Sequence, residues 1–455
     1  MAPIKTLLIA NRGEIAVRII RAARELGIRT VQAYSSADAS SLAVKLADAS
    51  VNIGPPQASK SYLAIDAILA AARDMLADAV HPGYGFLAEN ADFADAVESA
   101  GLIFVGPPGN VIRLMGDKAA ARQIAAKTGV PTAPGSIGRI DDPEQAGEIA
   151  SRLGYPVMIK AAAGGGGRGI RVARDRAELD RLAPQASSEA KAAFGDGGLY
   201  LEKVIERARH IEVQVLGDGH DVVHLFEREC SLQRRRQKLW EEAPAANLPD
   251  EVRVRLCACA VDLARAVSYR GAGTLEFLYD ETTRDFYFIE MNTRIQVEHP
   301  VTECITGVDL VREMIKIAGG ARLGLRQVDI RSVGHAIECR INAEDASKGF
   351  MPSPGVVTGL RVPGGPGVRF DSMLYAGYAV PPFYDSLIGK LIVWDESRAA
   401  ALERLQRALG ELEIEGLNTT IGLHTALARD ADIRALRFDT GFLERWLEAN
   451  ASHLT

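Results

Sequence analysis

The N-terminal part of the chain alternates short apolar runs with segments of helical periodicity, and this alternation restricts the possible folds most. An apolar run is followed by a segment whose apolar residues recur at helical spacing, and a second apolar run then begins. Strands that alternate with helices in this way pair in parallel, so we predict an α/β fold whose N-terminal part is a doubly wound parallel sheet. The expected strands cover residues 4–10, 30–34, 79–80 and 102–105, and the expected helices cover 14–26 and 62–72.

The first turn between a predicted strand and a predicted helix contains Asn11, Arg12 and Gly13. A dinucleotide-binding turn would carry the spacing Gly-x-Gly-x-x-Gly, which lets the backbone approach a pyrophosphate. That spacing is absent here, so a nicotinamide-dependent enzyme is disfavoured although its architecture would be similar.

Composition excludes several other classes of protein. The formal net charge is -6, and sequence-independent nucleic-acid binding needs a surplus of basic residues. The longest stretch without a charged residue, 99–112, is shorter than the ~18 residues of a membrane span. The apolar start at 7–10 is too short for a signal peptide, and the five cysteines form no Cys-x-x-Cys pair. We therefore expect a cytoplasmic, multidomain protein without nucleic-acid or membrane partners.

A dense glycine run lies between two predicted strands at 156–160 and 170–172. Residues 164–167 are all glycine, and Arg168 and Gly169 follow. Glycine backbone N–H groups can surround phosphate oxygens without interference from Cβ atoms, and Lys160 would add a positive charge to the same phosphates. The pattern indicates a phosphate-binding lid, and the alternative is a flexible loop without a ligand.

A predicted hairpin places acidic residues on neighbouring strands. Its strands contain Glu276 and Glu290, and residues 281–285 form the turn. A turn centred on Thr283 would put Glu276 directly opposite Glu290, with Asn292 on the same face. Facing carboxylates repel unless a cation lies between them, and oxygen ligands of this kind suit Mg²⁺ or Mn²⁺. The alternative is that the carboxylates pair with Lys or Arg on a solvated face.

The same alternation continues beyond the hairpin through Glu290, Asn292, Arg294, Gln296 and Glu298. If this segment stays extended, five polar side chains share one side of it. The planar guanidinium of Arg294 suits a carboxylate or carbonate, and Glu298 could accept a proton. This pattern favours a reactive site over the alternative, an exposed sheet face.

A basic cluster precedes the hairpin in sequence. Arg234, Arg235 and Arg236 are consecutive, and Lys238 follows Gln237. Such clusters are commonly solvated faces, but in a net-acidic chain they can also attract anions into a cleft. Spacing alone does not decide between these two interpretations.

Taken together, these motifs resemble biotin carboxylase, a family of ATP-grasp enzymes. The specific part of the resemblance is EMNTRIQVEHPVTE at 290–303 with ECRINAED at 338–345. Further similar segments are ANRGEIA at 10–16, HPGYGFLAEN at 81–90, LMGDK at 114–118, the loop 160–169, CSLQRR at 230–235 and YDSLIGK at 384–390. The similar segments extend over nearly the whole chain.

The resemblance implies a reaction and a domain plan. The reaction is ATP-dependent carboxylation of biotin by bicarbonate through carboxyphosphate, which yields N-carboxybiotin, ADP and phosphate as the first half-reaction of a carboxylase. The implied plan has an N-terminal α/β domain at 1–117, an ATP-grasp domain at 118–330 and a C-terminal α+β domain at 331–455. Within the ATP-grasp domain, a mobile glycine-rich lid would cover about 131–204.

The resemblance also implies the roles of individual residues. The residues expected to bind ATP are Lys118, Lys160, Gly166, Gly167, Glu202, Lys203, Val204, Ile205, His210, Arg236, Glu276 and Glu290. Those expected to bind bicarbonate are Lys238, Arg294, Gln296, Val297 and Glu298, among which Lys238, Arg294 and Glu298 would be catalytic. Arg340 and Tyr84 would lie near biotin, and Glu276, Glu290 and Asn292 would bind two Mg²⁺ or Mn²⁺ ions. Arg236 is a departure, because the family usually has His there.

The expected partners follow from the same resemblance. The chain has no Met-Lys dipeptide, so the biotinyl lysine is expected on a separate biotin carboxyl carrier protein. Carboxyltransferase subunits and a homodimer are also expected, while acetyl-CoA, another acyl-CoA and pyruvate all stay open as the final acceptor. Two other functions stay open beside this one: a different ATP-grasp ligase that transfers an acyl phosphate to an amine, and a non-catalytic homologue.

Overall fold

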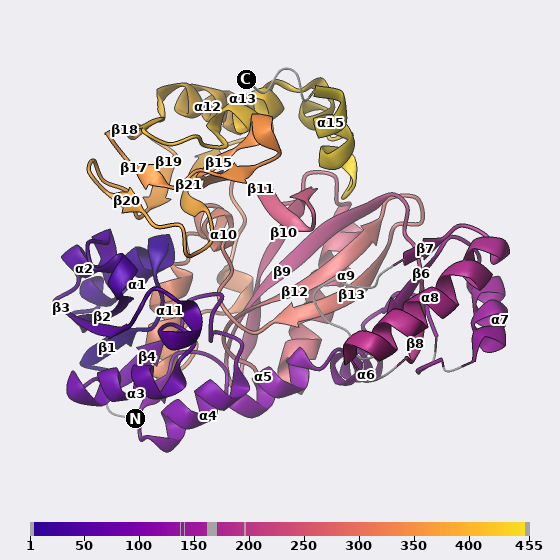
Figure 1. Cartoon of the computed structure of the whole chain (residues 1–455), viewed down its shortest axis with the longest axis horizontal. Helices are drawn as coiled ribbons and strands as arrows, with labels where there is room; N and C mark the ends of the chain where they lie inside the picture. The colour runs from indigo at the N-terminus through magenta and orange to yellow at the C-terminus, as the bar shows by residue number, and fades with distance from the viewer. Residues whose placement is uncertain (1–3, 137, 141, 162–170, 195–196, 451–455) are drawn as a thin grey trace. The chain divides into compact units, whose positions relative to one another are not determined.

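The structure is a computed structural model that describes residues 4–136, 138–140, 142–161, 171–194 and 197–450 (Figure 1). By its internal contacts the chain divides into two compact units. The first unit comprises Met1–Val130, Arg209–Phe277 and Glu290–Thr455, and the second comprises Pro131–Ala208 and Leu278–Ile289. The glycine run predicted to bind phosphate, with Gly166 and Gly167, lies outside the described residues.

The first unit begins with a five-stranded sheet in the order β3-β2-β1-β4-β5, in which every pair is parallel. Strand β1 is fully buried, because apolar residues of α1 such as Ile15 and Ile19 pack beside Leu7 and Ile9. This sheet confirms the predicted doubly wound fold. Its strands are β1 Thr6–Ile9, β2 Arg29–Ser35, β3 Ala49–Gly54, β4 Ala79–His81 and β5 Ile103–Phe104. The helices that follow in this region are α1 Gly13–Glu25, α2 Leu42–Leu46, α3 Ile65–Asp74, α4 Ala91–Ser99, α5 Gly109–Gly116 and α6 Lys118–Lys127.

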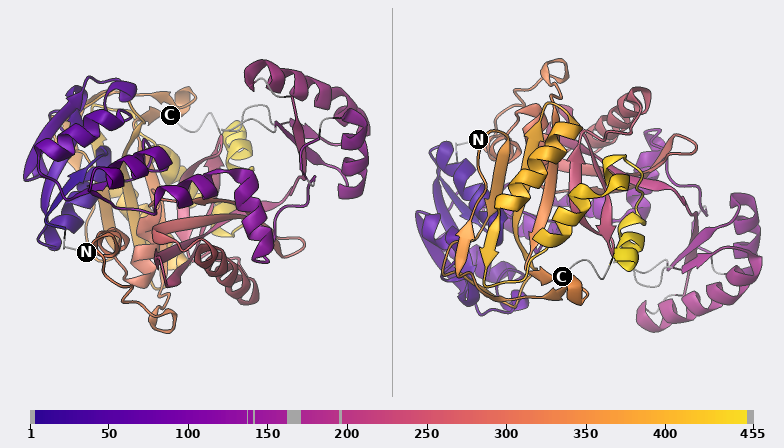
Figure 2. Two further views of the ribbon diagram at one scale, coloured as in Figure 1. Left: turned by 90° about the horizontal axis from the view of Figure 1, so that it is seen from below. Right: turned by 90° about the horizontal axis from the view of Figure 1, so that it is seen from above.

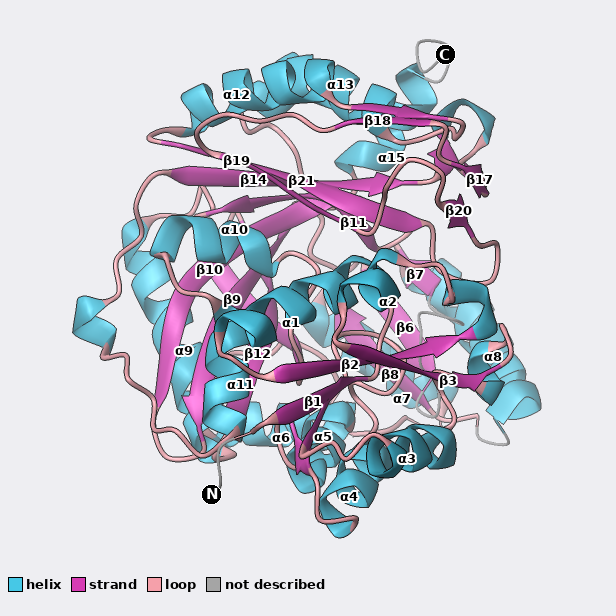
Figure 3. Ribbon diagram, turned by 90° about the vertical axis from the view of Figure 1, so that its left-hand side faces the viewer, coloured by secondary structure: helices cyan, strands magenta, loops and turns pink. Residues whose placement is uncertain are grey.

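A second sheet has eight strands in the order β13-β12-β9-β10-β11-β14-β21-β19. Helices α12 and α13 lie on one side of β14 and β21, and α10 lies on the other side (Figure 3). Between the strands and α12, residues such as Leu391 and Leu405 are fully buried. The strands are β9 Ala208–Asp218, β10 Val222–Arg234, β11 Gln237–Ala243, β12 Arg270–Asp280, β13 Asp285–Asn292, β14 His335–Asn342, β19 Val368–Ser372 and β21 Leu387–Asp395.

Smaller elements complete the first unit. The three two-stranded sheets pair β15 with β16, β17 with β20 and β18 with β22. Their bounds are β15 Glu344–Asp345, β16 Met351–Pro352, β17 Gly355–Val356, β18 Gly359–Arg361, β20 Ala379–Val380 and β22 Glu413–Glu415. The helices are α9 Asp250–Ala266, α10 His299–Thr306, α11 Leu310–Ala318, α12 Arg398–Glu411, α13 Ile421–Arg429, α14 Ala431–Arg434 and α15 Phe442–Asn450. None of the described helices combines the length and the apolar character that crossing a membrane requires.

Within Pro131–Ala208 of the second unit lies a small sheet in the antiparallel order β7-β6-β8, with α7 and α8 against it (Figure 2). Its core contains Ile159 and Leu201 from the strands, and Ala150 and Ala183 from the helices. The bounds are β6 Val157–Ala161, β7 Arg171–Ala173, β8 Leu199–Lys203, α7 Pro143–Leu153 and α8 Arg176–Phe194.

One local prediction is wrong. The segment from Glu290 to Glu298 does not stay extended, because β13 ends at Asn292 and Glu298 is already the N-cap residue of α10. Pro300 favours the first turn of that helix, where its missing N–H has no partner to lose. The polar side chains therefore converge because the chain bends after the strand, and not because they alternate along one face of an extended segment.

Candidate active site

A largely buried lysine surrounded by three carboxylates forms the centre of the candidate site. Lys238 Nζ on β11 donates hydrogen bonds to Glu276 Oε1 on β12 at 2.9 Å and to Glu298 Oε1 at 2.6 Å. It also donates a hydrogen bond to Glu212 on β9. We call these four residues the Lys238 cluster. Long-range strand pairing assembles the cluster, because its members lie on β9, β11 and β12 and at the start of α10.

The charges in the Lys238 cluster stabilise one another. Burial opposes the charge of Lys238, but the three carboxylates outweigh it and raise the pKa of the ammonium well above its usual value. Burial likewise opposes the negative charge of Glu298, yet Lys238, Arg340 and Arg228 hold the pKa of this carboxyl well below its usual range. Glu298 is thus a buried carboxylate that stays ionised at neutral pH, which is the state required of a proton acceptor.

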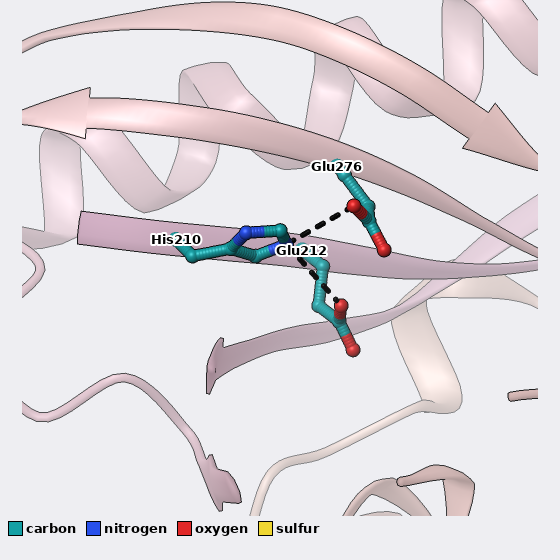
Figure 4. Close-up of side chains that lie close together, drawn as sticks. All are labelled: His210, Glu212 and Glu276. Carbon is teal, nitrogen blue, oxygen red and sulfur yellow. Dashed lines mark ion pairs between the residues drawn. The ribbon is translucent and has the colours of Figure 1, made fainter. Parts of the chain in front are cut away.

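Glu276 also contacts three residues outside the Lys238 cluster. Its Oε1 accepts hydrogen bonds from Asn292 Nδ2 and Gln296 Nε2, both at 2.9 Å. Its Oε2 lies 3.2 Å from His210 Nε2, which also lies 3.7 Å from Glu212 (Figure 4). Burial opposes ionisation of Glu276, but Lys238 and His210 hold its pKa well below the usual value. The carboxylate is therefore available to a cation.

The structure adds a residue that the sequence patterns did not single out. Arg228 on β10 is fully buried and donates to Glu212 at 2.6 Å and to Gln296 Oε1 at 2.8 Å. The same guanidinium also contacts Gln214 at 2.7 Å, Thr302 at 3.0 Å and Thr274 at 3.1 Å. Arg228 thereby fixes Gln296 and Glu212 relative to each other. The available sequence signal was weak, because Arg228 is one of three consecutive charged residues at 227–229 in β10.

Arg294 lies beside the Lys238 cluster. Its Nη2 donates to Asn292 Oδ1 at 3.0 Å, while its Nε donates to Glu89 Oε2 at 2.8 Å. Glu89 also accepts a hydrogen bond from the backbone N–H of Thr293 at 3.1 Å. The sequence did not point to Glu89, because its partner is distant in the chain. Arg294 presents a planar set of donors that can hold a small anion in two places at once.

The two residues predicted to lie near biotin have strong partners. Arg340 on β14 donates through Nε to Glu241 at 2.6 Å and through Nη2 to Glu298 at 3.0 Å. The hydroxyl of Tyr84 donates to Glu14, which also lies 3.2 Å from Lys390 Nζ. Lys390 further donates to the backbone oxygen of Val297 at 2.7 Å. Arg340 thus joins the Lys238 cluster directly through Glu298.

The predicted metal-binding residues supply hard oxygen donors. Glu276 and Glu290 lie on adjacent strands of one sheet, and Asn292 adds an amide that contacts Glu276. Glu290 has 38% exposure and lies 3.4 Å from Lys118 Nζ. Carboxylate and amide oxygens at the end of a sheet fit Mg²⁺ or Mn²⁺. A second possible ligand group is formed by His210, Glu212 and Glu276, whose ligand atoms lie within 4.8 Å of one another. The exact facing of Glu276 and Glu290 stays a prediction.

Several predicted nucleotide-binding residues belong to the second unit. Lys160 on β6 forms an ion pair with Glu202 on β8. Lys203 donates to the backbone oxygens of Gly154 at 2.9 Å and Tyr155 at 2.8 Å. Val204 and Ile205 follow β8 directly. The strand pairing of β6 with β8 places Lys160 beside this segment, since Lys160 pairs with Tyr200.

Arg236 and Cys230 lie on or next to β10 in the first unit. Arg236 lies in the turn between β10 and β11, where it is exposed and has a φ of 65°. Cys230 on β10 is buried, and burial together with the nearby Glu212 raises the pKa of its thiol well above the usual value. The thiol therefore stays protonated, which argues against a nucleophilic role for Cys230.

The comparisons with known families cover the chain in three consecutive stretches. Residues 3–112 match "Biotin carboxylase, N-terminal domain". Residues 117–326 match "Carbamoyl-phosphate synthase L chain, ATP binding domain", and residues 338–445 match "Biotin carboxylase C-terminal domain".

Individual relatives agree over almost the full length of the chain. Biotin carboxylase 1 of Bacillus subtilis (strain 168) is 53% identical over 97% of this chain and 99% of its own. Biotin carboxylase of Pseudomonas aeruginosa is 56% identical over 94% of this chain and 95% of its own. The biotin carboxylase domain dimer of Hydrogenobacter thermophilus 2-oxoglutarate carboxylase, solved with MgADP, ADP and bicarbonate, is 49% identical with a TM-score of 0.90, covering 99% of both chains. The chain therefore belongs to the biotin carboxylase family and is an ATP-grasp ligase.

Proposed function

We propose that this chain carboxylates biotin with bicarbonate at the expense of ATP, and that bicarbonate reacts at the Lys238 cluster. The observation that carries the proposal is the state of Glu298, which is buried yet held ionised between Lys238 and Arg340. A carboxylate in this setting can accept a proton from a small anion bound at the same cations. Lys238, Arg294, Gln296, Val297 and Glu298 are the proposed bicarbonate-binding residues.

In the first step Glu298 removes the proton of bicarbonate, and a bicarbonate oxygen attacks the γ-phosphorus of ATP. Bicarbonate bound at Lys238 takes over part of the hydrogen bonding that Lys238 gives Glu298, so the pKa of Glu298 rises toward a value that suits a base. Lys238 and Arg294 hold the anion in line, which removes the entropic cost of the encounter. The products are carboxyphosphate and ADP.

The proposed nucleotide and metal residues support this step. Divalent ions held by Glu276, Glu290 and Asn292 would neutralise phosphate charge, which is the main requirement of phosphoryl transfer. The proposed ATP-binding residues are Lys118, Lys160, Gly166, Gly167, Glu202, Lys203, Val204, Ile205, His210, Arg236, Glu276 and Glu290.

In the second step carboxyphosphate breaks down to CO₂ and phosphate. Phosphate accepts the proton of the biotin ureido nitrogen, which then attacks CO₂ to give N-carboxybiotin. Arg340 is proposed to stabilise the negative charge on the ureido oxygen, because its guanidinium keeps donors beyond those used by Glu241 and Glu298. Tyr84 is proposed to line the same side of the biotin site.

The domain plan and the partners belong to the same proposal. The plan assigns 1–117 to the N-terminal domain, 118–330 to the ATP-grasp domain with a lid at about 131–204, and 331–455 to the C-terminal domain. The Hydrogenobacter thermophilus relative was solved as a dimer and is a domain of a carboxylase, which supports a dimer within a carboxylase complex here. A biotin carboxyl carrier protein and carboxyltransferase subunits are the proposed partners.

The direct test measures phosphate release from Mg-ATP by the purified chain, with and without bicarbonate and free biotin. Release that requires bicarbonate and rises with biotin is the expected result. Release that ignores both compounds would contradict the proposal and favour another ATP-grasp ligase, and no release at all would favour a non-catalytic homologue.

Replacing Arg294 by Ala should uncouple ATP turnover from bicarbonate. The substitution removes the planar donors beside Asn292, so bicarbonate loses its second cation and we expect kcat/KM for bicarbonate to fall at least about 100-fold. Arg113→Ala is the control, since Arg113 is 55% exposed and pairs only with Asp92 and Asp95 among its described contacts. An Arg294→Ala protein with unchanged bicarbonate dependence would contradict the assigned role.

A further inference from the structure

The main chain of Arg340 is fixed by side chains from a different element. Its backbone oxygen accepts hydrogen bonds from Thr420 Oγ1 at 3.0 Å and from the ring of buried His424 at 2.8 Å. Thr420 Oγ1 also accepts a hydrogen bond from the backbone N–H of Asn342 at 3.0 Å. These hydrogen bonds hold the backbone of Arg340 in place on β14, independently of the contacts of its side chain.

The side chain of Arg340 lies between two buried carboxylates. Glu298, at one end of the guanidinium, belongs to the Lys238 cluster, whereas Glu241 on β11 is fully buried and contacts Nε at 2.6 Å. Glu298 also accepts a hydrogen bond from Lys238. Glu241, in contrast, accepts a side-chain hydrogen bond only from Arg340 among the described residues. Glu241 is thus placed to draw the guanidinium away from Glu298.

A second buried carboxylate faces Glu241 across the ladder. Glu241 and Glu338 are directly paired between β11 and β14, so their side chains are neighbours on one face of the sheet. Within the described part of the chain, Glu241 Oε2 and both oxygens of Glu338 are buried without a hydrogen-bond partner. Two neighbouring buried carboxyl groups with so few donors favour a proton on one of them, since adjacent buried carboxylates cannot both ionise.

We propose that Glu241 is a positioning residue for Arg340, and that Glu338 is its protonated neighbour, which lets Glu241 remain the anion. The proposal rests on the assignment of Arg340 to biotin under the proposed function. Anionic Glu241 holds the guanidinium so that its remaining donors face the ureido oxygen. If Glu241 were neutral, the guanidinium of Arg340 would pair with Glu298 alone. Its remaining donors would then no longer face biotin.

The electrostatic surroundings support this division of roles. Burial raises the pKa of Glu338 well above its usual value, with Lys390 opposing and Glu241 adding to the shift. Burial raises the pKa of Glu241 to about 7, although Arg340 opposes this shift. The charged and titratable groups that interact with the pair from the surrounding elements are Lys238, Cys230, Glu298, Arg340, Lys390, Tyr84, Cys304 and Cys339.

The test compares Glu241→Gln with Glu338→Gln, two substitutions that are equal in size and burial. Glu241→Gln should lower the biotin-stimulated part of ATP turnover at least tenfold and raise KM for biotin, while bicarbonate-dependent turnover without biotin changes less than threefold. Glu338→Gln should keep biotin stimulation within threefold, because a neutral group already stands there. Glu227→Gln, a buried carboxylate paired with Arg253, controls for the loss of any buried charge.

The pH profile gives a readout that a merely structural role would not change. In the unmodified chain, biotin stimulation should fall as the pH drops through about 7, because protonation removes the anion that holds Arg340. Glu241→Gln should lack this step, and Glu338→Gln should keep it. Equal effects of the two substitutions, or an unchanged profile in Glu241→Gln, would overturn the inference. If the unmodified chain shows no biotin stimulation, the proposed function itself has failed.

Discussion

Replacing Lys238 by Met is expected to abolish bicarbonate-dependent ATP turnover, with a fall in kcat of at least about 1,000-fold. Lys238 is the shared cation of Glu212, Glu276 and Glu298, and methionine keeps its length without its charge. Without the ammonium, burial dominates and the pKa of Glu298 rises, so that the carboxyl becomes protonated near neutral pH and can no longer accept a proton. Bicarbonate also loses its principal cation.

The matched control for this substitution is Lys316→Met, because Lys316 is partly exposed and pairs with Glu313 within a single helix. That variant should keep turnover within about twofold of the unmodified chain. The Lys238→Met variant should regain part of its activity as the pH is raised. Because the pKa of Glu298 is higher in this variant, the carboxyl becomes ionised, and able to accept a proton, only at a higher pH. Turnover above a tenth of the unmodified rate at pH 7 would contradict the role given to Lys238.

Replacing Arg228 by Met should lower the free energy of unfolding by about 3–5 kcal/mol, which is the cost of removing one partner from a buried ion pair. The guanidinium has 0% exposure, and its contacts reach Glu212, Gln296 and three further residues on different elements. Its loss leaves buried acceptors without donors in the centre of the sheet. Urea denaturation followed by circular dichroism measures the change.

Arg113→Met is the control for stability, since Arg113 is more than half exposed and surface ion pairs contribute at most about 1 kcal/mol. Should Arg228→Met not fold, Arg228→Lys keeps the charge with fewer donors and is expected to show an intermediate loss. A loss no greater than that of Arg113→Met would show that Arg228 does not organise the site.

Much of the fold could be predicted because it follows from local periodicity. The helix expected at 14–26 is α1 Gly13–Glu25, and the helix expected at 62–72 corresponds to α3 Ile65–Asp74. The predicted ends of the short strands are less accurate, as at Ile103–Phe104 in place of 102–105, because a strand of two residues carries little periodic signal. The eight-stranded order could not be predicted, since pairing between distant strands leaves no trace in local spacing.

The candidate site was predictable to the extent that its residues are close in sequence. Glu276, Asn292, Gln296 and Glu298 do converge, and the hairpin pattern with the polar run after it indicated this. The extended path beyond Asn292 was wrong, because helix α10 begins within the polar run. Glu212, Arg228, Glu241 and Glu89 escaped notice because each pairs with a residue that is not near it in the chain. Charged residues in a strand, such as the run at 227–229, also resemble exposed positions.

The most direct test of the central claim follows oxygen atoms from bicarbonate. Attack of a bicarbonate oxygen on the γ-phosphorus transfers that oxygen to phosphate when carboxyphosphate breaks down. Purified chain incubated with Mg-ATP, biotin and ¹⁸O-labelled bicarbonate should therefore release phosphate that carries one ¹⁸O atom, as measured by mass spectrometry, and Glu298→Gln should release almost none. Phosphate whose added oxygen comes from water, at the same rate with and without bicarbonate, would contradict the account.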